Sequence, residues 1–267
     1  MIQLANLKIL GEGRLARVYR LDECRLLKVF KHQNVAEYEF KQTSAVWNAG
    51  VCSQKPHSMT CVEGREAIIY DYLEGKLLMD VVRDDMSHVL RHIRHMAECH
   101  AAILKGVCVE LPSYRDGLQY AITHAPGITD GQRACLLQGL KAMPDGDHVL
   151  HGDLHPMNIL VCSDGLHAID WMTGSRGDPA ADIARTWFMV RYSAAEGKGS
   201  SFLTDIAQPV LAKAYMDRVC ALTGTDKQKV MKWVPFVAAA RLAEDRPAGE
   251  VRTIQQIVGQ YCGPAVK

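Results

Sequence analysis

The chain has 267 residues, enough for two modest domains or one bilobal unit at about 150 residues per domain. Apolar residues make up 48% of the chain and charged residues 23%, a balance that excludes a disordered protein. The 31 basic residues against 30 acidic ones give a formal charge of +1, so there is no basis for a dedicated nucleic-acid binder, which carries a strongly basic face. A small or neutral partner fits this charge better.

Membrane and export signals are not recognisable in the sequence. No stretch approaches the roughly 20 apolar residues of a membrane span, and residues 1–10 lack the features of a signal peptide. The nine cysteines are scattered without a CxxC pair, so their spacing predicts neither a disulfide framework nor a zinc knuckle. We expect a cytoplasmic protein with no membrane partner.

The first seventy residues are predicted to be mainly strands, because short runs of branched and aromatic residues alternate with turn-formers. The predicted strands are Leu7–Leu10, Arg17–Leu21, Arg25–Phe30 and Ala67–Tyr72. One helix, Val35–Trp47, interrupts them and ends at Asn48-Ala49-Gly50.

After Glu74-Gly75 the sequence favours helices. The predicted helices are Met86–Leu104, Leu118–His124, Gln132–Met143, Ala180–Tyr192, Phe202–Leu222 and Lys227–Ala243. A small hairpin is expected among them, with strands Ile159–Cys162 and Leu166–Ile169 around the turn Ser163-Asp164-Gly165. The predicted domains are therefore residues 1–73, rich in strands, and residues 74–267, mainly helical.

A glycine loop, Gly11-Glu12-Gly13-Arg14-Leu15-Ala16, lies between the first two predicted strands. It is either a plain hairpin turn or a cover for phosphates, since residues without a Cβ let backbone N–H groups come close to a ligand. A dinucleotide fold is excluded because a strand, not a helix, follows, and no P-loop motif is present. If the loop covers a nucleotide, Val18 would direct an apolar side chain toward the base.

Lys28 is a lone cation within the apolar run Leu26–Phe30. An unpaired buried ammonium group is costly, so Lys28 needs an anion. A phosphate oxygen is one candidate and a carboxylate of the following helix is another, with Glu39 as first choice and Glu37 as the alternative. An edge-strand lysine that reaches solvent is the remaining interpretation.

The most informative segment is His151–Leu160, which is followed by Ile169-Asp170-Trp171. Phosphoryl transfer needs a carboxylate that orients the attacking hydroxyl, and hard oxygen ligands that hold Mg²⁺. Asp153 fits the first role. Asn158 lies at the entrance to the predicted hairpin and Asp170 at its exit, so the turn brings both side-chain oxygens to the same end of the hairpin, where they can share a metal. Each residue alone could instead be a cap or a turn residue.

These residues resemble the aminoglycoside phosphotransferase and choline kinase group, relatives of the protein kinases that phosphorylate small molecules. The strongest matches are HGDLHPMNIL at residues 151–160, IDW at 169–171 and GDPAADIAR at 177–185; GEGRLARVY and LLKVF are weaker. The resemblance implies an α+β, two-lobed protein-kinase-like fold. Its small N-lobe would be rich in strands with one helix, its larger C-lobe mainly helical, and ATP would bind between them.

Carried over by position, the resemblance assigns a role to each matching residue. Asp153 corresponds to the catalytic base, Asn158 and Asp170 to the Mg²⁺ ligands, and Lys28 to the contact with the α- and β-phosphates, with Glu39 as its ion-pair partner. The hinge that binds adenine would be Asp71, Tyr72 and Leu73, and the apolar floor beneath the base would be Leu160 and Ile169. The loop over the phosphates would contain Gly11 and Gly13. Asp182 would be a structural residue that braces the loop carrying Asp153. Arg14 and Ala16 depart from the glycine-rich pattern.

The acceptor is predicted to be a small molecule, because the seven residues 171–177 leave no room for an activation loop and a peptide platform. Residues 191–267 hold 11 Lys or Arg against 7 Asp or Glu, which disfavours polycationic aminoglycosides despite the family's name. We expect a hydroxyl of a sugar, an amino alcohol or an aminoglycoside-like compound. Candidate pocket residues, which helix packing explains equally well, are Trp233, Phe236, Arg241 and Glu244. The alternative function is a nucleotide-binding pseudokinase that acts as a scaffold or regulator.

Overall fold

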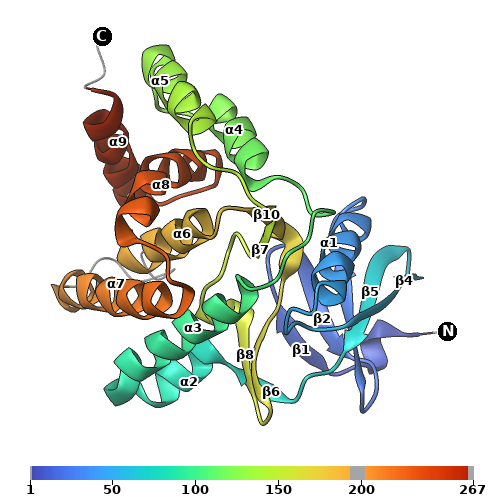
Figure 1. Ribbon diagram of the computed structural model, residues 1–267. Helices are drawn as coiled ribbons and strands as arrows, with labels where there is room; N and C mark the ends of the chain where they lie inside the picture. The colour runs from blue at the N-terminus through green and yellow to red at the C-terminus, as the bar shows by residue number, and fades with distance from the viewer. Residues whose placement is uncertain (1, 193–201, 264–267) are drawn as a thin grey trace.

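The computed structural model describes residues 2–192 and 202–263. An antiparallel sheet with one helix lies on one side of the molecule and a larger, mainly helical part on the other (Figure 1). The expected α+β architecture with two lobes is confirmed.

The N-lobe sheet has five strands in the order β1-β2-β3-β5-β4, and every neighbouring pair is antiparallel. Its strands are β1 (Ile9–Glu12), β2 (Ala16–Arg20), β3 (Arg25–Phe30), β4 (Pro56–Val62) and β5 (Arg65–Asp71). β3 is central, and both of its faces are buried, which explains its almost continuous apolar sequence. Lys28 is the exception in this strand.

Helix α1 (Ala36–Asn48) packs against the sheet, and a carboxylate from the sheet caps its N-terminus. Glu66 of β5 accepts hydrogen bonds from the backbone N–H groups of Asn34, Val35 and Ala36. These bonds hold the pKa of Glu66 below its ordinary value. They satisfy N–H groups that a helix leaves without internal partners, and so fix the direction of α1 relative to the sheet.

Several elements were not predicted from the sequence, among them β4 and α9 (Ala248–Cys262). β4 is an edge strand that is largely exposed, so it lacks the alternation of apolar and polar residues that identifies a strand. Helix α9 contains Gly249 and Gly259, and glycine weakens the pattern of a helix.

Two small ladders position the predicted catalytic segment. Downstream of β5, strand β6 (Gly75–Leu77) pairs with β8 (Ile159–Cys162), and β8 forms the predicted hairpin with β9 (Gly165–Ala168). A second ladder joins β7 (His148–Leu150) to β10 (Ser175–Gly177). Residues 151–174 therefore form one loop that is closed at its base by β7 and β10.

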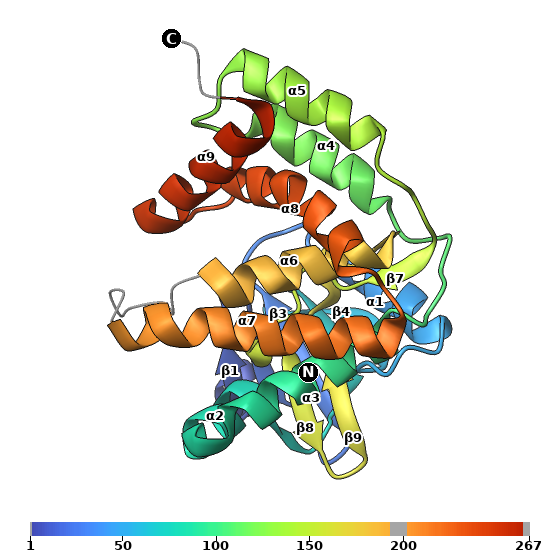
Figure 2. The ribbon, with the colours of Figure 1, turned by 60° about the vertical axis from the view of Figure 1, so that its left-hand side comes forward.

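The C-lobe helices are α2 (Leu78–Asp84), α3 (Val89–Ile103), α4 (Tyr114–His124), α5 (Asp130–Lys141), α6 (Pro179–Tyr192), α7 (Phe202–Thr223), α8 (Lys227–Ala240) and α9. α6 packs against both α7 and α8, and Figure 2 shows it between them. Its buried face therefore lies in the largest hydrophobic core of the protein. Among the described residues, no helix combines the length and apolar character that crossing a membrane requires.

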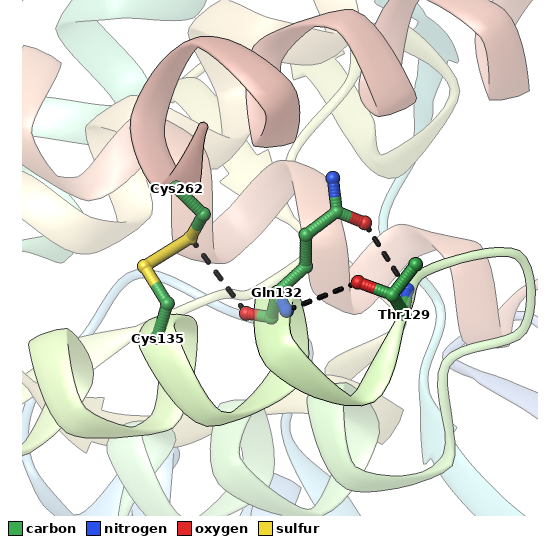
Figure 3. Close-up of a disulfide and its surroundings, with 4 residues drawn as sticks. All are labelled: Thr129, Gln132, Cys135 and Cys262. Carbon is green, nitrogen blue, oxygen red and sulfur yellow. Dashed lines mark hydrogen bonds between the residues drawn. A yellow bond between two sulfur atoms is a disulfide. The ribbon is translucent and has the colours of Figure 1, made fainter. Parts of the chain in front are cut away.

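One pair of cysteines corrects the sequence analysis. Cys135 of α5 and Cys262 at the end of α9 form a disulfide, with their Cα atoms 5.9 Å apart (Figure 3). The bond lies one turn beyond the start of α5, where Thr129 and Gln132 form a capping box. The spacing of the cysteines indicated no disulfide framework and so did not reveal this bridge, because a separation of 127 residues leaves no local spacing pattern.

Candidate active site

The loop that carries Asp153 is anchored to helix α6 by one buried carboxylate. Asp182 Oδ2 accepts a hydrogen bond from the His151 N–H at 2.6 Å, and Oδ1 accepts one from the Gly152 N–H at 3.0 Å. His100 of α3 lies 3.1 Å from Asp182 Oδ2 on its other side, and Tyr215 lies 2.5 Å from the same imidazole. Desolvation opposes the charge of Asp182, but His100, His151 and these bonds outweigh it and lower its pKa. Through Asp182, His100 and Tyr215 the loop is thus linked to α6, α3 and α7.

Gly152 is required by the close approach of two chain segments. Its φ of 75° lies in the left-handed region, and a Cβ at this position would lie 2.7 Å from the carbonyl oxygen of Thr173. The Thr173 hydroxyl donates a hydrogen bond of 2.8 Å to the His151 carbonyl. The turn before Asp153 therefore packs directly against the segment that follows Asp170.

His151 joins the same two segments through its ring. Nε2 lies 3.1 Å from the Ile169 carbonyl, to which it donates, and Nδ1 accepts from the Asp153 N–H at 3.3 Å. Burial lowers the pKa of His151, which agrees with the neutral ring that this pattern requires. The ring also packs on Trp171, with centroids 4.6 Å apart. His151 thereby fixes the position of Asp153 relative to Asp170.

The Asp153 carboxylate has an imidazole and a guanidinium group beside it. His155 Nε2 lies 3.6 Å from Oδ2, and an Arg185 NH2 nitrogen lies 3.5 Å from Oδ1. Burial by itself would raise the pKa of Asp153, but the His155 contact and the Arg185 charge outweigh it and hold the pKa far below its ordinary range. Asp153 is therefore ionised at physiological pH, as an acceptor for a hydroxyl proton must be.

Asn158 and Asp170 lie at the two ends of the β8–β9 hairpin, as predicted. Asn158 Nδ2 donates to the Asp153 carbonyl at 3.0 Å, while the Ile169 N–H donates to the Asn158 carbonyl at 3.0 Å. Within the described residues the side-chain oxygen of Asn158 accepts no hydrogen bond, so it is available to a ligand. Asp170 has a φ of 64°, a strained conformation that proteins concentrate at functional sites.

Lys28 pairs with Glu39, the first of the two glutamates considered from the sequence. Its Nζ lies 2.7 and 2.8 Å from the two carboxylate oxygens of Glu39, and 3.1 Å from Asp170 Oδ1. Glu37 is exposed on α1. Burial would lower the pKa of Lys28, but the two carboxylates outweigh it and raise the pKa, so the ammonium stays charged. Tyr70 donates a further hydrogen bond of 2.9 Å to Glu39.

The glycine loop forms the β1–β2 hairpin, and its glycines have no structural requirement of their own. A Cβ at Gly11 would meet nothing within 4 Å, and one at Gly13 would meet only Ala16 O, at 3.8 Å. Neither residue has a positive φ. Lys31 Nζ donates to the Gly13 carbonyl at 2.8 Å and steadies the loop. The space above these glycines is open to a ligand.

The predicted hinge residues differ in their free backbone groups. The N–H groups of Asp71 and Tyr72 donate to the carbonyls of Lys55 and Cys24. Within the described residues, the Leu73 N–H forms no hydrogen bond and remains available. Val18 and Tyr72 pack against the same apolar cluster of the N-lobe. The predicted floor residues Leu160 and Ile169 are both half-buried, on β8 and directly after β9.

Arg185 was not singled out from the sequence, although it follows Asp182 by three residues and so lies on the same face of α6. It is 8% exposed and bridges Asp153 to Glu244, whose Oε1 lies 2.8 Å away. Arg241 and Arg246 also contact Glu244, and Arg241 pairs with buried Glu250 at 2.7 Å. Of the four candidate pocket residues, Glu244 and Arg241 thus belong to a charged network beside Asp153, whereas Trp233 and Phe236 lie in the core.

The comparisons with known proteins agree with this geometry. The model of the phosphotransferase enzyme family matches residues 6–226. A ternary complex of aminoglycoside phosphotransferase APH(4)-Ia with AMP-PNP and hygromycin B is 17% identical, with a TM-score of 0.63 over 97% of this chain and 92% of that one. Amicoumacin kinase hAmiN in complex with AMP-PNP, Ca²⁺ and Ami is 12% identical, also with a TM-score of 0.63, over 97% and 89%.

An aminoglycoside-3'-phosphotransferase of type VIII is 15% identical, with a TM-score of 0.58 over 88% of this chain and 93% of that chain. No curated protein matches the chain. At these identities the solved structures show the shared fold, and the family is shown by the family model, which covers well over half of the sequence. The chain therefore belongs to the phosphotransferase enzyme family, and it is an enzyme of the small-molecule kinase type.

Proposed function

We propose that this protein transfers the γ-phosphoryl group of ATP to a hydroxyl group of a small metabolite, with Mg²⁺ as the metal. The observation that carries the proposal is the linked set of Lys28, Asp153, Asn158 and Asp170, which hydrogen bonds and an ion pair join across the two lobes. A carboxylate and an amide oxygen are hard ligands of the kind that Mg²⁺ prefers. Bound Mg²⁺ would neutralise charge on the phosphates.

The nucleotide would be held by three parts of the chain. Lys28, kept charged and aimed by Glu39, contacts the α- and β-phosphates, and the open glycines Gly11 and Gly13 let the β1–β2 backbone approach the phosphates. The free N–H of Leu73 contacts the edge of the adenine. Val18 covers the base from the N-lobe, and Leu160 and Ile169 lie beneath it.

Asp153 serves as the base and orients the acceptor. It accepts a hydrogen bond from the acceptor hydroxyl and aims the oxygen at the γ-phosphorus. As that oxygen bonds to phosphorus, the bond from phosphorus to the leaving oxygen of ADP breaks, and the hydroxyl proton passes to Asp153. The low pKa of Asp153 keeps its carboxylate ionised, so it can accept the hydrogen bond from the acceptor hydroxyl. Asp153 contributes chiefly by positioning.

The acceptor is proposed to be a neutral or anionic metabolite such as a sugar or a hydroxy acid. Two of the similar structures contain hygromycin B or amicoumacin, so antibiotics are substrates worth testing. The network beside Asp153 nevertheless contains three guanidinium groups against the two carboxylates of Glu244 and Glu250. A polycation next to Asp153 would be repelled by the nearest of these groups, Arg185.

A substrate panel tests this proposal through ADP release. The panel holds neutral sugars, amino alcohols, hydroxy acids, aminoglycosides and a peptide, each with Mg²⁺ and ATP. We expect turnover on a neutral or anionic compound and none on the peptide. The Asp153→Asn variant should bind nucleotide normally but lose on the order of 10²- to 10⁴-fold in rate. An unchanged rate in that variant, or turnover on polycations alone, would contradict the proposal.

A further inference from the structure

A second cluster of metal-binding side chains lies at the turn of the β8–β9 hairpin. Cys162, Asp164 and His167 each offer a donor atom, and these atoms all lie within 4.8 Å of one another. Cys52, which follows α1 in sequence, adds a second thiol: its Sγ lies 3.2 Å from Nδ1 of His167 and 3.9 Å from Nε2. Cys52 lies outside the group of three whose donor atoms are all within 4.8 Å of one another, and His167 is its contact with that group, so it is a fourth potential ligand at the edge of the cluster.

The hairpin register brings these side chains together. His167 is paired with Leu160 and Cys162 with Gly165, so Cys162 and His167 lie on the same face of the two strands. Asp164 belongs to the turn, and its Oδ1 lies 3.0 Å from His167 Nε2. Cys52 is fixed from the other direction, since its carbonyl accepts a hydrogen bond from the Ala168 N–H at 3.3 Å.

The distances are close to those of ligands on a single zinc ion. Zinc binds thiolate sulfur at about 2.3 Å and imidazole nitrogen or carboxylate oxygen at about 2.0–2.2 Å, so in a tetrahedral site two such ligands lie roughly 3.3–3.8 Å apart. His167 Nε2 is 3.0 Å from Asp164 Oδ1 and 3.9 Å from Cys52 Sγ. His167 and Asp164 therefore need little movement to share one ion, whereas Cys52 must move closer to the rest of the cluster. His167 itself is 8% exposed, which fixes its ring.

The alternative for these residues is a metal-free chain from thiol to imidazole to carboxylate, as in a nucleophilic triad. Such a chain would use one imidazole nitrogen for Cys52, at 3.2 Å from Nδ1, and the other for Asp164, at 3.0 Å from Nε2. It would leave the Cys162 thiol without a role, although its sulfur lies within 4.8 Å of the donor atoms of Asp164 and His167. A metal ion would engage this further donor group as well.

We propose that Cys52, Cys162, Asp164 and His167 bind one Zn²⁺ ion in a structural site. Two thiol protons are released when the ion binds, and no other bond is broken. The site lies at the opposite end of the hairpin from Asn158 and Asp170, so the ion takes no part in phosphoryl transfer. It ties the segment after α1 to the hairpin that presents the proposed magnesium ligands. The site is independent of the function proposed above.

The test uses Co²⁺ as a spectroscopic probe on metal-free protein in which the Cys135–Cys262 disulfide is intact and the other cysteines are reduced. Cobalt bound to thiolate gives a charge-transfer absorption that oxygen and nitrogen ligands do not give, so binding at Asn158 and Asp170 is not counted. We expect one equivalent of Co²⁺ to produce this band and Zn²⁺ to displace it. Cys52→Ser and Cys162→Ser should each weaken the band, whereas Cys61→Ser, which alters an exposed cysteine of β4, should leave it unchanged.

Thermal melting provides a second measurement. Zn²⁺ should raise the Tm of the wild-type protein and of Cys61→Ser, because a ligand that binds only the folded state stabilises it. The exposed Asp164→Asn change is safe for folding and should weaken Co²⁺ binding by at least about tenfold. The proposal is overturned if the wild type shows no thiolate band, or if both Cys162→Ser and Asp164→Asn bind Co²⁺ as tightly as the wild type.

Discussion

The ammonium nitrogen of Lys28 lies 3.1 Å from Oδ1 of Asp170, so a cation of the N-lobe contacts the carboxylate at the exit of the C-lobe hairpin. The same nitrogen is held by both oxygens of Glu39. Lys28 therefore lies between its partner Glu39 and a proposed magnesium ligand, Asp170. Phosphate oxygens and the metal must share these charges when ATP binds.

Replacing Lys28 separates its structural role from its proposed catalytic one. Lys28→Met leaves Glu39 buried without its cation, so we expect a loss of about 3–5 kcal/mol in the free energy of unfolding. The double variant Lys28→Met/Glu39→Gln removes both charges and should recover much of that stability. Neither variant should recover kcat/KM for ATP. Urea unfolding and steady-state kinetics measure the two effects, and a fully active double variant would contradict the assigned role.

Gly13→Ala tests whether the glycine loop approaches phosphates. A methyl group at Gly13 fits the protein without a clash, so the Tm should not fall. The added Cβ would hold the backbone away from the nucleotide and raise KM for ATP several-fold, equivalent to about 1 kcal/mol. Gly117→Ala in α4, which also meets open space, is the control and should leave KM unchanged. Unchanged KM in both variants would show that the loop does not contact ATP.

Arg185 is expected to determine the acid limit of activity. It helps to hold the pKa of Asp153 low, and a lowered pKa means that the active, ionised form persists to low pH. In Arg185→Gln that pKa should rise toward its ordinary value, so the acid limb of the kcat/KM profile moves to higher pH. Arg185→Lys keeps the charge and should shift the limb less. A purely structural role would lower activity equally at every pH.

Asp182→Asn should destabilise the protein and change its response to acid. Removing the buried charge that faces His100 and two backbone N–H groups is expected to cost about 3–5 kcal/mol. The pKa of Asp182 is lowered by folding, so its stabilising effect is present above the unfolded pKa of about 3.9 and is lost as pH falls through the folded value. In urea unfolding, the difference in the free energy of unfolding between variant and wild type should therefore be largest near neutral pH. That difference should become smaller in acid. Equal stability at neutral pH would exclude the bracing role.

The sequence by itself determined the elements and groups that are close along the chain. The β8–β9 hairpin with Asn158 and Asp170 at its ends, and the helix that brings Glu39 to Lys28, follow from turn residues and periodicity within short segments. Such local patterns restrict the backbone strongly, because one turn or one helix fixes where every side chain in it points. Lys28, Asp153, Asn158 and Asp170 were accordingly recognisable from the sequence, whereas Arg185 was not.

Only the tertiary structure decided which distant groups meet. Arg185 reaches Asp153, His100 reaches Asp182, Cys135 bonds to Cys262, and Cys52 joins the hairpin turn. In each case the partners lie on different elements, and their distance depends on how helices and strands pack rather than on residue spacing. Packing against the common core, rather than a local motif, determines which charged groups surround Asp153 and which cysteines come close to one another.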